Sequence, residues 1–171
     1  MKMKFLPLFA AVLVLVTACG NRSAKAPASA VSDEASVVYF TKEITPESLV
    51  KIYEALGREA SGRVAIKIST GEMGGNNYLK PELIAGLVQK VNGTLVECNT
   101  AYAGQRLTTE DHLKVIEAHG FSAIAPVDIM DAEGEIKIPV KDDKWIKYDL
   151  VGSHIANYDY MINLAHFKKH S

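Results

Sequence analysis

The stretch VAIKISTGEMGGNN, residues 64–77, decides the fold class. Apolar residues alternate in its first part at Val64, Ile66 and Ile68, and this spacing predicts a β-strand. The second part is a glycine-rich loop, after which Pro81 stands where a helix can begin. The apolar face of that helix has residues at helical spacing: Ile84, Leu87, Val88 and Val91. Strand, loop and helix in this order are the first part of a βαβ unit.

Strand-like and helix-like segments alternate on both sides of this stretch. A β-type run at residues 37–40 precedes a helix that has Thr45 as its N-cap and Gly57 at its end. Residues 94–96 are a third strand candidate, and Thr108 then caps a third helix. Strands that alternate with helices predict βαβ units. We therefore expect an α/β fold, a partly parallel sheet with flanking helices in three layers.

The pattern changes after the third helix. Residues 127–130 and 136–138 flank a good turn sequence, and residues 145–151 follow as a further strand-like run. We expect these segments to form a small antiparallel insertion over residues 126–151. A last apolar run, Met161–Leu164, predicts a return to a buried strand.

Composition narrows the possible partners and cofactors. The 171 residues include 19 Lys and Arg against 20 Asp and Glu, and the net charge of −1 gives no electrostatic footprint for nucleic acid. The two cysteines exclude a disulfide scaffold, a four-thiolate zinc site and a four-cysteine iron–sulfur cluster within this chain. A hydrophobic fraction of 48% is typical of a globular domain.

The N-terminus has the pattern of a secretory signal peptide. Lys2 and Lys4 are basic, and the uncharged run Phe5–Val16 is shorter than the roughly 20 residues that a membrane span needs. The small residues before Cys19 resemble the lipobox of bacterial lipoproteins. That resemblance implies that residues 1–18 are removed and that Cys19 is lipidated. An ordinary secretory signal with a chance cysteine is the alternative.

Lipidation of Cys19 makes the membrane a partner of this chain. Burial contributes about 0.8 kcal/mol per methylene, so the several acyl chains on a lipoprotein cysteine hold far more firmly than a single one. Residues 19–36 are rich in Ala and Ser and are predicted to be a flexible tether, so the domain spans residues 37–171. We expect a lipid-anchored protein of the bacterial cell envelope, with either membrane possible.

The glycine-rich loop of residues 70–77 lies between a predicted strand and a predicted helix. In an α/β sheet this is the carboxyl edge, where ligands commonly bind. Glycines let a loop turn tightly and present amide donors to an anion. The loop lacks the Gly-Lys-Ser/Thr of a P-loop and the dinucleotide fingerprint. A plain structural loop and a ligand-contacting loop both remain possible.

The histidines and the second cysteine give weaker signals. His166 and His170 have the spacing of one helix face, but no glutamate stands between them as in a zinc protease, and we expect no metal site. Cys98 is expected to act as a small apolar residue. His112 and His119 are expected to be surface residues of the third helix.

Three segments resemble the domain-of-unknown-function family 362 of bacteria and archaea, often labelled an uncharacterised iron–sulfur-centre family. Residues 64–79 resemble its lysine-bearing strand and glycine-rich loop, and residues 95–97 its strand that ends in an acidic residue. Residues 158–168 resemble its segment of aspartate, apolar strand, asparagine and then Lys-x-His. The last motif falls on Lys168 and His170, with a long Lys between them where a small residue is usual.

The resemblance implies a fold and candidate residues, but it implies no reaction. The candidate ligand-contacting residues at the carboxyl edge are Lys67, Glu72, Asn77, Lys168 and His170. Lys and His are natural contacts for a small anionic ligand. The iron–sulfur label belongs to members with an added cysteine cluster, which this sequence lacks, so no cofactor is expected in this chain.

The family domain normally continues further, so the chain looks like a lipoprotein form truncated at its C-terminus. Three hypotheses follow. The domain binds a small anionic ligand; it is a non-catalytic envelope protein that contacts another protein; or it is an inactive fragment of a longer protein. Whether the domain is an enzyme is left open.

Overall fold

The computed structural model describes residues 36–167, and the chain divides into two units, Met1–Val37 and Val38–Ser171. All the helices and strands described lie in the second unit. The predicted signal peptide, the lipidation site Cys19 and nearly all of the predicted tether lie outside the described residues. Lys168 and His170 lie outside them as well.

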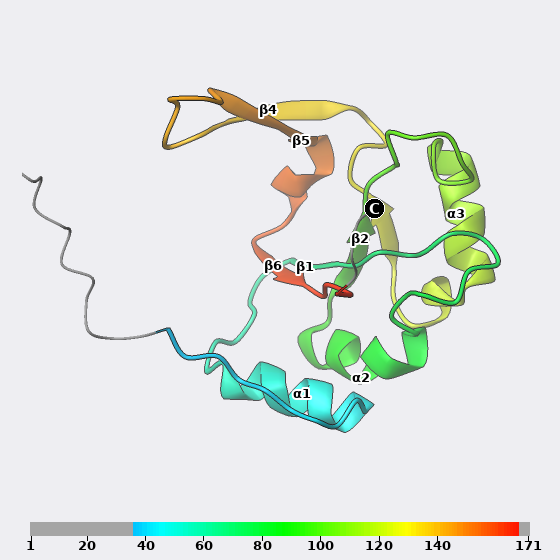
Figure 1. Cartoon of the computed structure of the whole chain (residues 1–171), viewed down its shortest axis with the longest axis vertical. Coiled ribbons are helices and arrows are strands. Elements are labelled where there is room, and N and C mark those ends of the chain that lie inside the picture. Colours follow the sequence, from blue (N-terminus) through cyan, green and yellow to red (C-terminus); the bar gives the residue numbers. More distant parts are fainter. Residues whose placement is uncertain (1–35, 168–171) are drawn as a thin grey trace, which may run out of the picture. The chain divides into compact units, whose positions relative to one another are not determined.

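A parallel sheet in the order β3-β2-β1-β6 forms the centre of the second unit (Figure 1). The strands are β1 (Val64–Lys67), β2 (Thr94–Glu97), β3 (Val127–Ile129) and β6 (Tyr160–Asn163). The helices are α1 (Pro46–Ala55), α2 (Pro81–Val91) and α3 (Thr109–Ala118), with 3-10 helices η1 (Phe121–Ala123) and η2 (Ser153–Asn157). The predicted α/β fold is confirmed. Because the strands are parallel, their carboxyl ends meet at one edge of the sheet.

The predicted helix starts are also confirmed. The Thr45 side chain accepts from the Ser48 amide at 3.1 Å, and Ser48 Oγ accepts from the Thr45 amide at 3.0 Å, which together make a capping box. Pro46 and Pro81 occupy the first turns of α1 and α2, where a missing N–H costs nothing. Thr108 caps α3 by accepting from the Asp111 amide. These side chains supply partners for backbone groups that a helix end leaves free.

The helices cover one face of the sheet. Val64, Ile66 and Leu95 point to that face and pack with residues of α2, α3 and η1, among them Ile84, Val88, Ile116 and Phe121. Alternation along the strands places Ala65 and Val96 on the opposite face. There, within the described residues, the cover is Met130, Cys98, Tyr158 and Ile155 of η2 rather than the helices of a third layer.

The segment Val37–Phe40 was expected to be a strand, and that expectation is wrong. The four residues have no regular structure, and Val38 and Phe40 are more than 80% exposed. High β-propensity does not by itself form a strand, because a strand needs a neighbour for its backbone groups.

The predicted insertion is confirmed in part. β4 (Glu135–Pro139) and β5 (Tyr148–Gly152) form an antiparallel hairpin, with Ile136 opposite Val151. Residues 127–129 do not belong to it. They form β3 of the main sheet, parallel to β2, because Val127 and Ile129 pack into the core beside Leu95. The turn between β3 and β4 therefore connects two sheets.

The predicted strand near Met161 is present as β6, but it is not a buried strand. It pairs with β1 and is an edge among the strands described. Tyr160 and Ile162 pack against the core, whereas Met161 is 42% exposed and Asn163 is exposed. The half-buried Tyr160 and Ile162 alternate with the exposed Met161 and Asn163, as expected for an edge strand with one face open to solvent.

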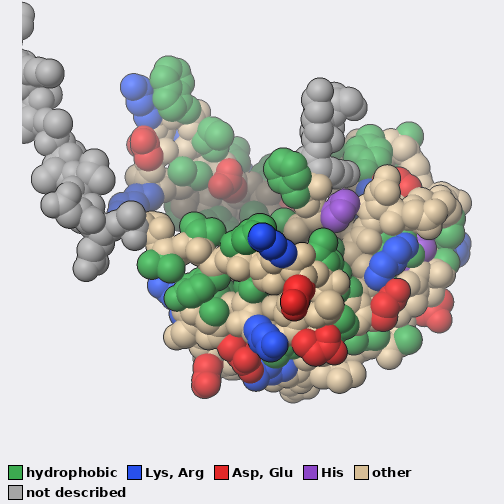
Figure 2. Space-filling view, turned by 60° about the horizontal axis from the view of Figure 1, so that its bottom comes forward, with side chains coloured by type: hydrophobic (Ala, Val, Ile, Leu, Met, Phe, Trp, Pro, Cys, Tyr) green, Lys and Arg blue, Asp and Glu red, His purple; other side chains and the backbone are tan. Residues whose placement is uncertain are grey.

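Charges of both signs are interspersed over the face of the molecule shown in Figure 2, and no single sign dominates it. Among the residues described, no helix combines the length and the apolar character that crossing a membrane requires.

Gly152 should be a sensitive position. A Cβ there would lie 2.5 Å from the backbone C and O of Met130, and Met130 N donates to Glu97 O. We expect Gly152→Ala to lower the free energy of unfolding by about 1–3 kcal/mol, as overpacking does. Gly86→Ala is the control, because its Cβ would meet only Val50 at 3.7 Å and would favour α2 by about 0.5–1 kcal/mol. Urea titration measures both; equal stability of the two variants would contradict the prediction.

Candidate functional site

A polar cavity of about 550 Å³ lies at the carboxyl edge of the sheet. Lys67 and Glu97, the last residues of β1 and β2, form its floor together with Cys98. The walls come from the glycine-rich loop after β1 and from the loop between β2 and α3. His166, three residues beyond β6, completes the lining. The volume falls within the range of small-molecule sites.

Glu97 is the most buried charged group of the cavity, with its side chain 7% exposed. Its Oε1 accepts from Lys67 Nζ at 2.7 Å and from the Cys98 amide at 3.3 Å. Its Oε2 accepts from the Thr70 amide at 2.9 Å and lies 3.9 Å from Arg106 Nη1. Each carboxylate oxygen therefore has a donor, as a buried charge requires.

Arg106 forms the second charged pair of the cavity. Its Nε donates to Glu72 Oε1 at 3.1 Å, and its Nη2 donates to the same oxygen and to the Tyr102 hydroxyl. Tyr102 in turn donates to Glu72 Oε1 at 2.9 Å. The hydrogen bond from Arg106 holds the pKa of Glu72 below its ordinary value, so Glu72 is ionised at neutral pH. Lys67 and Arg106 are thus each paired with a carboxylate.

The glycine-rich loop places Glu72 opposite Arg106. Gly71 and Gly74 have φ of 78° and 74°, the left-handed region that favours glycine. Gly75 N donates to Glu72 O at 2.8 Å and closes a turn. A Cβ on Gly71 would lie 2.8 Å from the Tyr78 ring, so glycine is needed there for space as well.

A buried hydrogen-bond chain supports both loops from below. Thr70 Oγ1 lies 2.9 Å from His112 Nε2, and His112 Nδ1 lies 3.4 Å from Asn99 Oδ1. Asn99 Nδ2 donates to Thr109, so its Oδ1 is the acceptor and His112 carries its proton on Nδ1. Burial lowers the pKa of His112, which keeps the ring neutral.

The expectation that His112 and His119 lie on the surface is wrong. His112 is 0% exposed. His119 is half-buried, donates from Nδ1 to Thr70 O at 2.8 Å, and stacks on Tyr78 with ring centres 4.2 Å apart. The spacing of residues along α3 did not indicate which face of the helix is buried. The histidines are accommodated on the inner side because Thr70 offers them hydrogen-bond partners there.

The cavity brings together three of the predicted site residues: Lys67, Glu72 and Asn77. Lys168 and His170 fall outside the described residues. The structure adds residues that were not chosen from the sequence: Glu97, Cys98, Tyr102, Arg106 and His166. Glu97 could have been predicted, because it ends the strand next to β1 in a parallel sheet. Arg106 could not, because it lies in an irregular loop to which no spacing rule applies.

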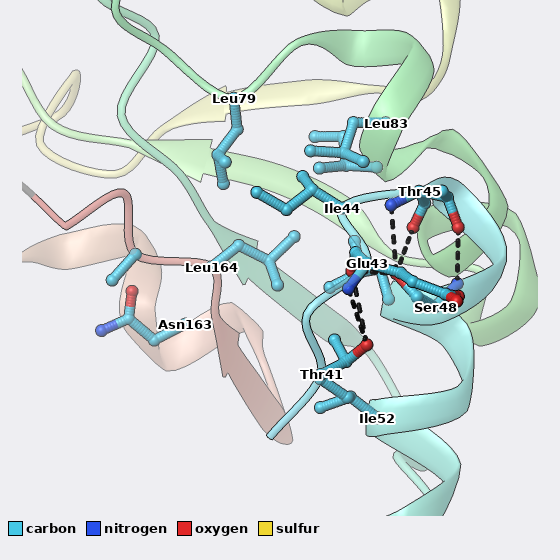
Figure 3. A pocket seen from close by; sticks show the side chains of 13 residues that line it. Thr41, Glu43, Ile44, Thr45, Ser48, Ile52, Leu79, Leu83, Asn163 and Leu164 are labelled. Carbon is cyan, nitrogen blue, oxygen red and sulfur yellow. Dashed lines mark hydrogen bonds between the residues drawn. The ribbon is translucent and has the colours of Figure 1, made fainter. Parts of the chain in front are cut away.

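A second cavity, of about 310 Å³, lies between α1, α2 and the residues after β6. Figure 3 shows Ile44, Leu79, Leu83 and Leu164 around it. Its polar groups are used locally, since Ser48 Oγ donates to Glu43 O and takes part in the α1 cap. With little left to orient a polar ligand, it is a weaker candidate than the carboxyl-edge cavity.

One further polar cluster lies on the face of the sheet opposite the helices. Asp128 Oδ1 lies 2.7 Å from His154 Nδ1, and Asp128 Oδ2 accepts from the Tyr158 hydroxyl at 2.7 Å. The hydrogen bond with Asp128 raises the pKa of His154, and burial raises the pKa of Tyr158. Within residues 36–167, no group of three or more His, Cys, Asp or Glu side chains is placed to hold a metal ion.

Comparison with known proteins gives one match. The family model described as Domain of unknown function (DUF362) matches residues 64–171, more than half of the chain. No curated protein and no solved structure matches the chain. The matched residues begin at β1 and include every described lining residue of the carboxyl-edge cavity.

The two histidines with shifted pKa values predict opposite pH dependences of stability. The folded-state pKa of His112 is lowered from 6.5, so its contribution is fully present above pH 6.5 and is lost as the pH falls, when the unfolded chain takes up the proton. The folded-state pKa of His154 is raised, so its contribution is present below pH 6.5 and is lost as the pH rises.

The test is urea unfolding of wild type, His112→Gln and His154→Gln between about pH 7.5 and 5.5, where one proton changes stability by about 1.4 kcal/mol per pH unit at most. As the pH falls, His112→Gln should gain stability relative to wild type, and His154→Gln should lose it. Parallel stability profiles for the three proteins would show that neither histidine couples protonation to folding.

Proposed function

The chain belongs to the Domain of unknown function (DUF362) family, and we propose that it is a lipid-anchored protein of the bacterial cell envelope whose α/β domain binds a small anionic ligand at the carboxyl edge of its sheet. The observation that carries the proposal is the meeting of Lys67 and Arg106 in one polar cavity beside a glycine-rich loop. The proposal is one of binding; it assigns no reaction and no cofactor to this chain.

Lys67 supports this proposal by its spare donor capacity. An ammonium group has three N–H donors. Among the residues described, Nζ donates to Glu97 Oε1 and to Ile68 O, which uses two of them. The side chain is 29% exposed at the cavity, so water or a ligand can reach it. A ligand oxygen would be the third acceptor without breaking the pair with Glu97.

The loop around Lys67 adds neutral donors. The side chains of Asn76 and Asn77 line the same cavity, and a side-chain amide donates two hydrogen bonds. Lys168 and His170 remain part of the proposal, because the family resemblance assigns them to this site and the preceding His166 already lines the cavity.

The alternative of a non-catalytic interaction protein has one observation in its favour. The β4–β5 hairpin carries exposed apolar side chains, with Trp145 84%, Ile146 56% and Leu150 53% exposed. A two-stranded hairpin alone is marginally stable in water, so such a hairpin gains stability from a partner surface. Ligand binding remains the better supported function, because the carboxyl-edge cavity combines a volume of about 550 Å³ with converging charged groups of both signs. The fragment alternative rests on the family resemblance alone.

We expect Lys67→Gln to weaken the binding of an anion at least about tenfold, which corresponds to 1.4 kcal/mol. Glutamine keeps a polar partner for Glu97 but lacks the charge that attracts the anion. Titration calorimetry of the detergent-solubilised full chain with succinate and with inorganic phosphate measures the loss.

Lys51→Gln is the matched control, because Lys51 is an exposed residue of α1 that does not line this cavity. It should bind both anions as wild type does. Equal affinity of wild type and Lys67→Gln for the anion that wild type binds would refute the role given to Lys67.

The proposed anchor predicts a change of location. Cys19→Ala should move the protein from the membrane fraction to the soluble fraction, because lipid chains on Cys19 are the attachment proposed here. Fractionation of cells expressing each form, with a high-salt wash, measures this. Cys98→Ala should stay with the membrane, and a Cys19→Ala protein that still sediments with washed membranes would contradict the lipoprotein proposal.

A further inference from the structure

The Glu72–Arg106 pair is unequal in burial. The Arg106 side chain is 10% exposed, whereas that of Glu72 is 50% exposed. Arg106 is held from two sides, since Nη1 also lies 3.9 Å from the buried Glu97. Glu72 is held on one side only, by Arg106 and Tyr102. If Glu72 left, Arg106 would keep one carboxylate neighbour and would not become an unpaired buried charge.

The hydrogen bonds that Glu72 accepts are also concentrated on one of its two carboxylate oxygens. Arg106 Nε, Arg106 Nη2 and the Tyr102 hydroxyl all donate to a single oxygen, Oε1. Within the described part of the chain no donor is assigned to Oε2. A guanidinium fork fits a carboxylate best when two parallel N–H groups meet two oxygens. Glu72, fixed to its loop, does not reach that arrangement, whereas a free carboxylate can.

The loop that carries Glu72 contains three glycines. Gly71 precedes Glu72, and Gly74 and Gly75 follow in the turn that Gly75 N closes on Glu72 O. Glycine has many accessible backbone conformations, so the loop can rearrange with little steric cost. The Glu72 side chain is already 50% exposed, so water can solvate its carboxylate when it leaves Arg106.

The charges of the cavity favour exchange over addition. Lys67 and Arg106 are balanced by Glu72 and Glu97, so the four groups sum to zero. An anion added to this set would face two carboxylates at close range, which is unfavourable in a partly buried site. A carboxylate group with a single negative charge that replaces Glu72 leaves the sum unchanged.

We infer that Glu72 occupies the place of a ligand carboxylate, so the ligand of this cavity is a small carboxylic acid whose carboxylate displaces Glu72 from Arg106 and Tyr102. This inference rests on the proposed function, which it makes specific. The protein's own carboxylate shows which group the Arg106–Tyr102 pair accepts. Displacement of Glu72 also couples the conformation of the loop of residues 71–77 to binding of the ligand.

The test measures binding of succinate by titration calorimetry to the full chain and to variants of Glu72. Glu72→Gln removes the competing charge, and Glu72→Asp keeps the charge but shortens its reach to Arg106. Both should lower the Kd of succinate, Glu72→Gln by at least about tenfold and Glu72→Asp by less. Glu117→Gln, a charge-matched change at the far end of α3, should leave the Kd within twofold of wild type.

Three companion measurements complete the design. The neutral analogue succinamide should not bind, and Arg106→Lys, which keeps the charge but lacks the fork, should raise the Kd of succinate. Inorganic phosphate should gain less than succinate from Glu72→Gln. Thermal unfolding without ligand checks that each variant is folded, and Glu72→Asp serves if Glu72→Gln is not.

Each of the other possible results contradicts either the inference about Glu72 or the proposed function. If wild type binds succinate but the Glu72 variants bind it no more tightly, Glu72 is a wall of the cavity, and the inference fails while the proposed function stands. If only Glu72→Gln improves binding and Glu72→Asp does not, Glu72 acts by repulsion and does not hold the ligand's place. If phosphate gains as much as succinate, the site is not specific for carboxylates. If neither anion binds to any form, the proposed function fails together with the inference.

Discussion

The buried carboxylate of Glu97 is the constraint on which the carboxyl edge depends. An isolated carboxylate out of water costs several kcal/mol, so its oxygens need donors from the protein. They receive them from the end of β1 through Lys67, from the following loop through the Thr70 amide, and from the residue after β2 through the Cys98 amide. One charge thereby fixes where β1 ends, where its loop turns and where the adjacent strand stops. Removing it would leave Lys67 and Arg106 close together without the anion between them.

The same constraint extends to the helices through Thr70. Its amide binds Glu97, its hydroxyl binds His112 of α3, and its carbonyl accepts from His119. A single buried residue therefore connects the sheet edge to both ends of α3. This explains how a loop rich in glycine holds a defined position: Thr70, just before Gly71, forms hydrogen bonds on three sides. Lys67 lies at the end of β1 before Thr70, and Glu72 lies in the glycine-rich loop after it.

Much of the fold could be predicted from the sequence because local patterns agree with tertiary contacts there. Proline at the first turn, threonine at the N-cap and alternating apolar residues in β1 each have one low-energy interpretation. Prediction from the local sequence pattern was wrong where the structure of a segment depends on which strand it pairs with. Residues 127–129 read equally well as part of a hairpin or as a parallel strand, and Val37–Phe40 has β-propensity without a neighbour. Strand pairing is non-local, so a short window of sequence does not contain it.

The residues of the candidate site likewise fall into those that the sequence predicts and those that it does not. Lys67 could be predicted, because it ends a strand and precedes a glycine-rich loop. Its partner Glu97 is thirty residues away in sequence, and only the parallel register of β1 and β2 brings the two together. Arg106 could not be predicted, since it comes from a loop whose path follows no periodic rule. The exposure of His112 and His119 was predicted wrongly, because a polar residue in a helix is usually exposed. Only the structure shows that Thr70 provides a buried hydrogen-bond partner for both.

The remaining groups of the cavity are engaged in hydrogen bonds or are protonated, which is compatible with the proposed binding role. Burial raises the pKa of Cys98, with nearby Asp131 acting in the same direction, so its thiol is protonated at neutral pH and is a poor nucleophile. His112 has both ring nitrogens engaged beneath the loop, which leaves neither free to move a proton in the cavity. Lys67 Nζ lies 2.7 Å from Glu97 Oε1 and donates a hydrogen bond to it. These residues place a set of hydrogen-bond donors around the cavity, and the proposed ligand would exchange with one carboxylate, that of Glu72.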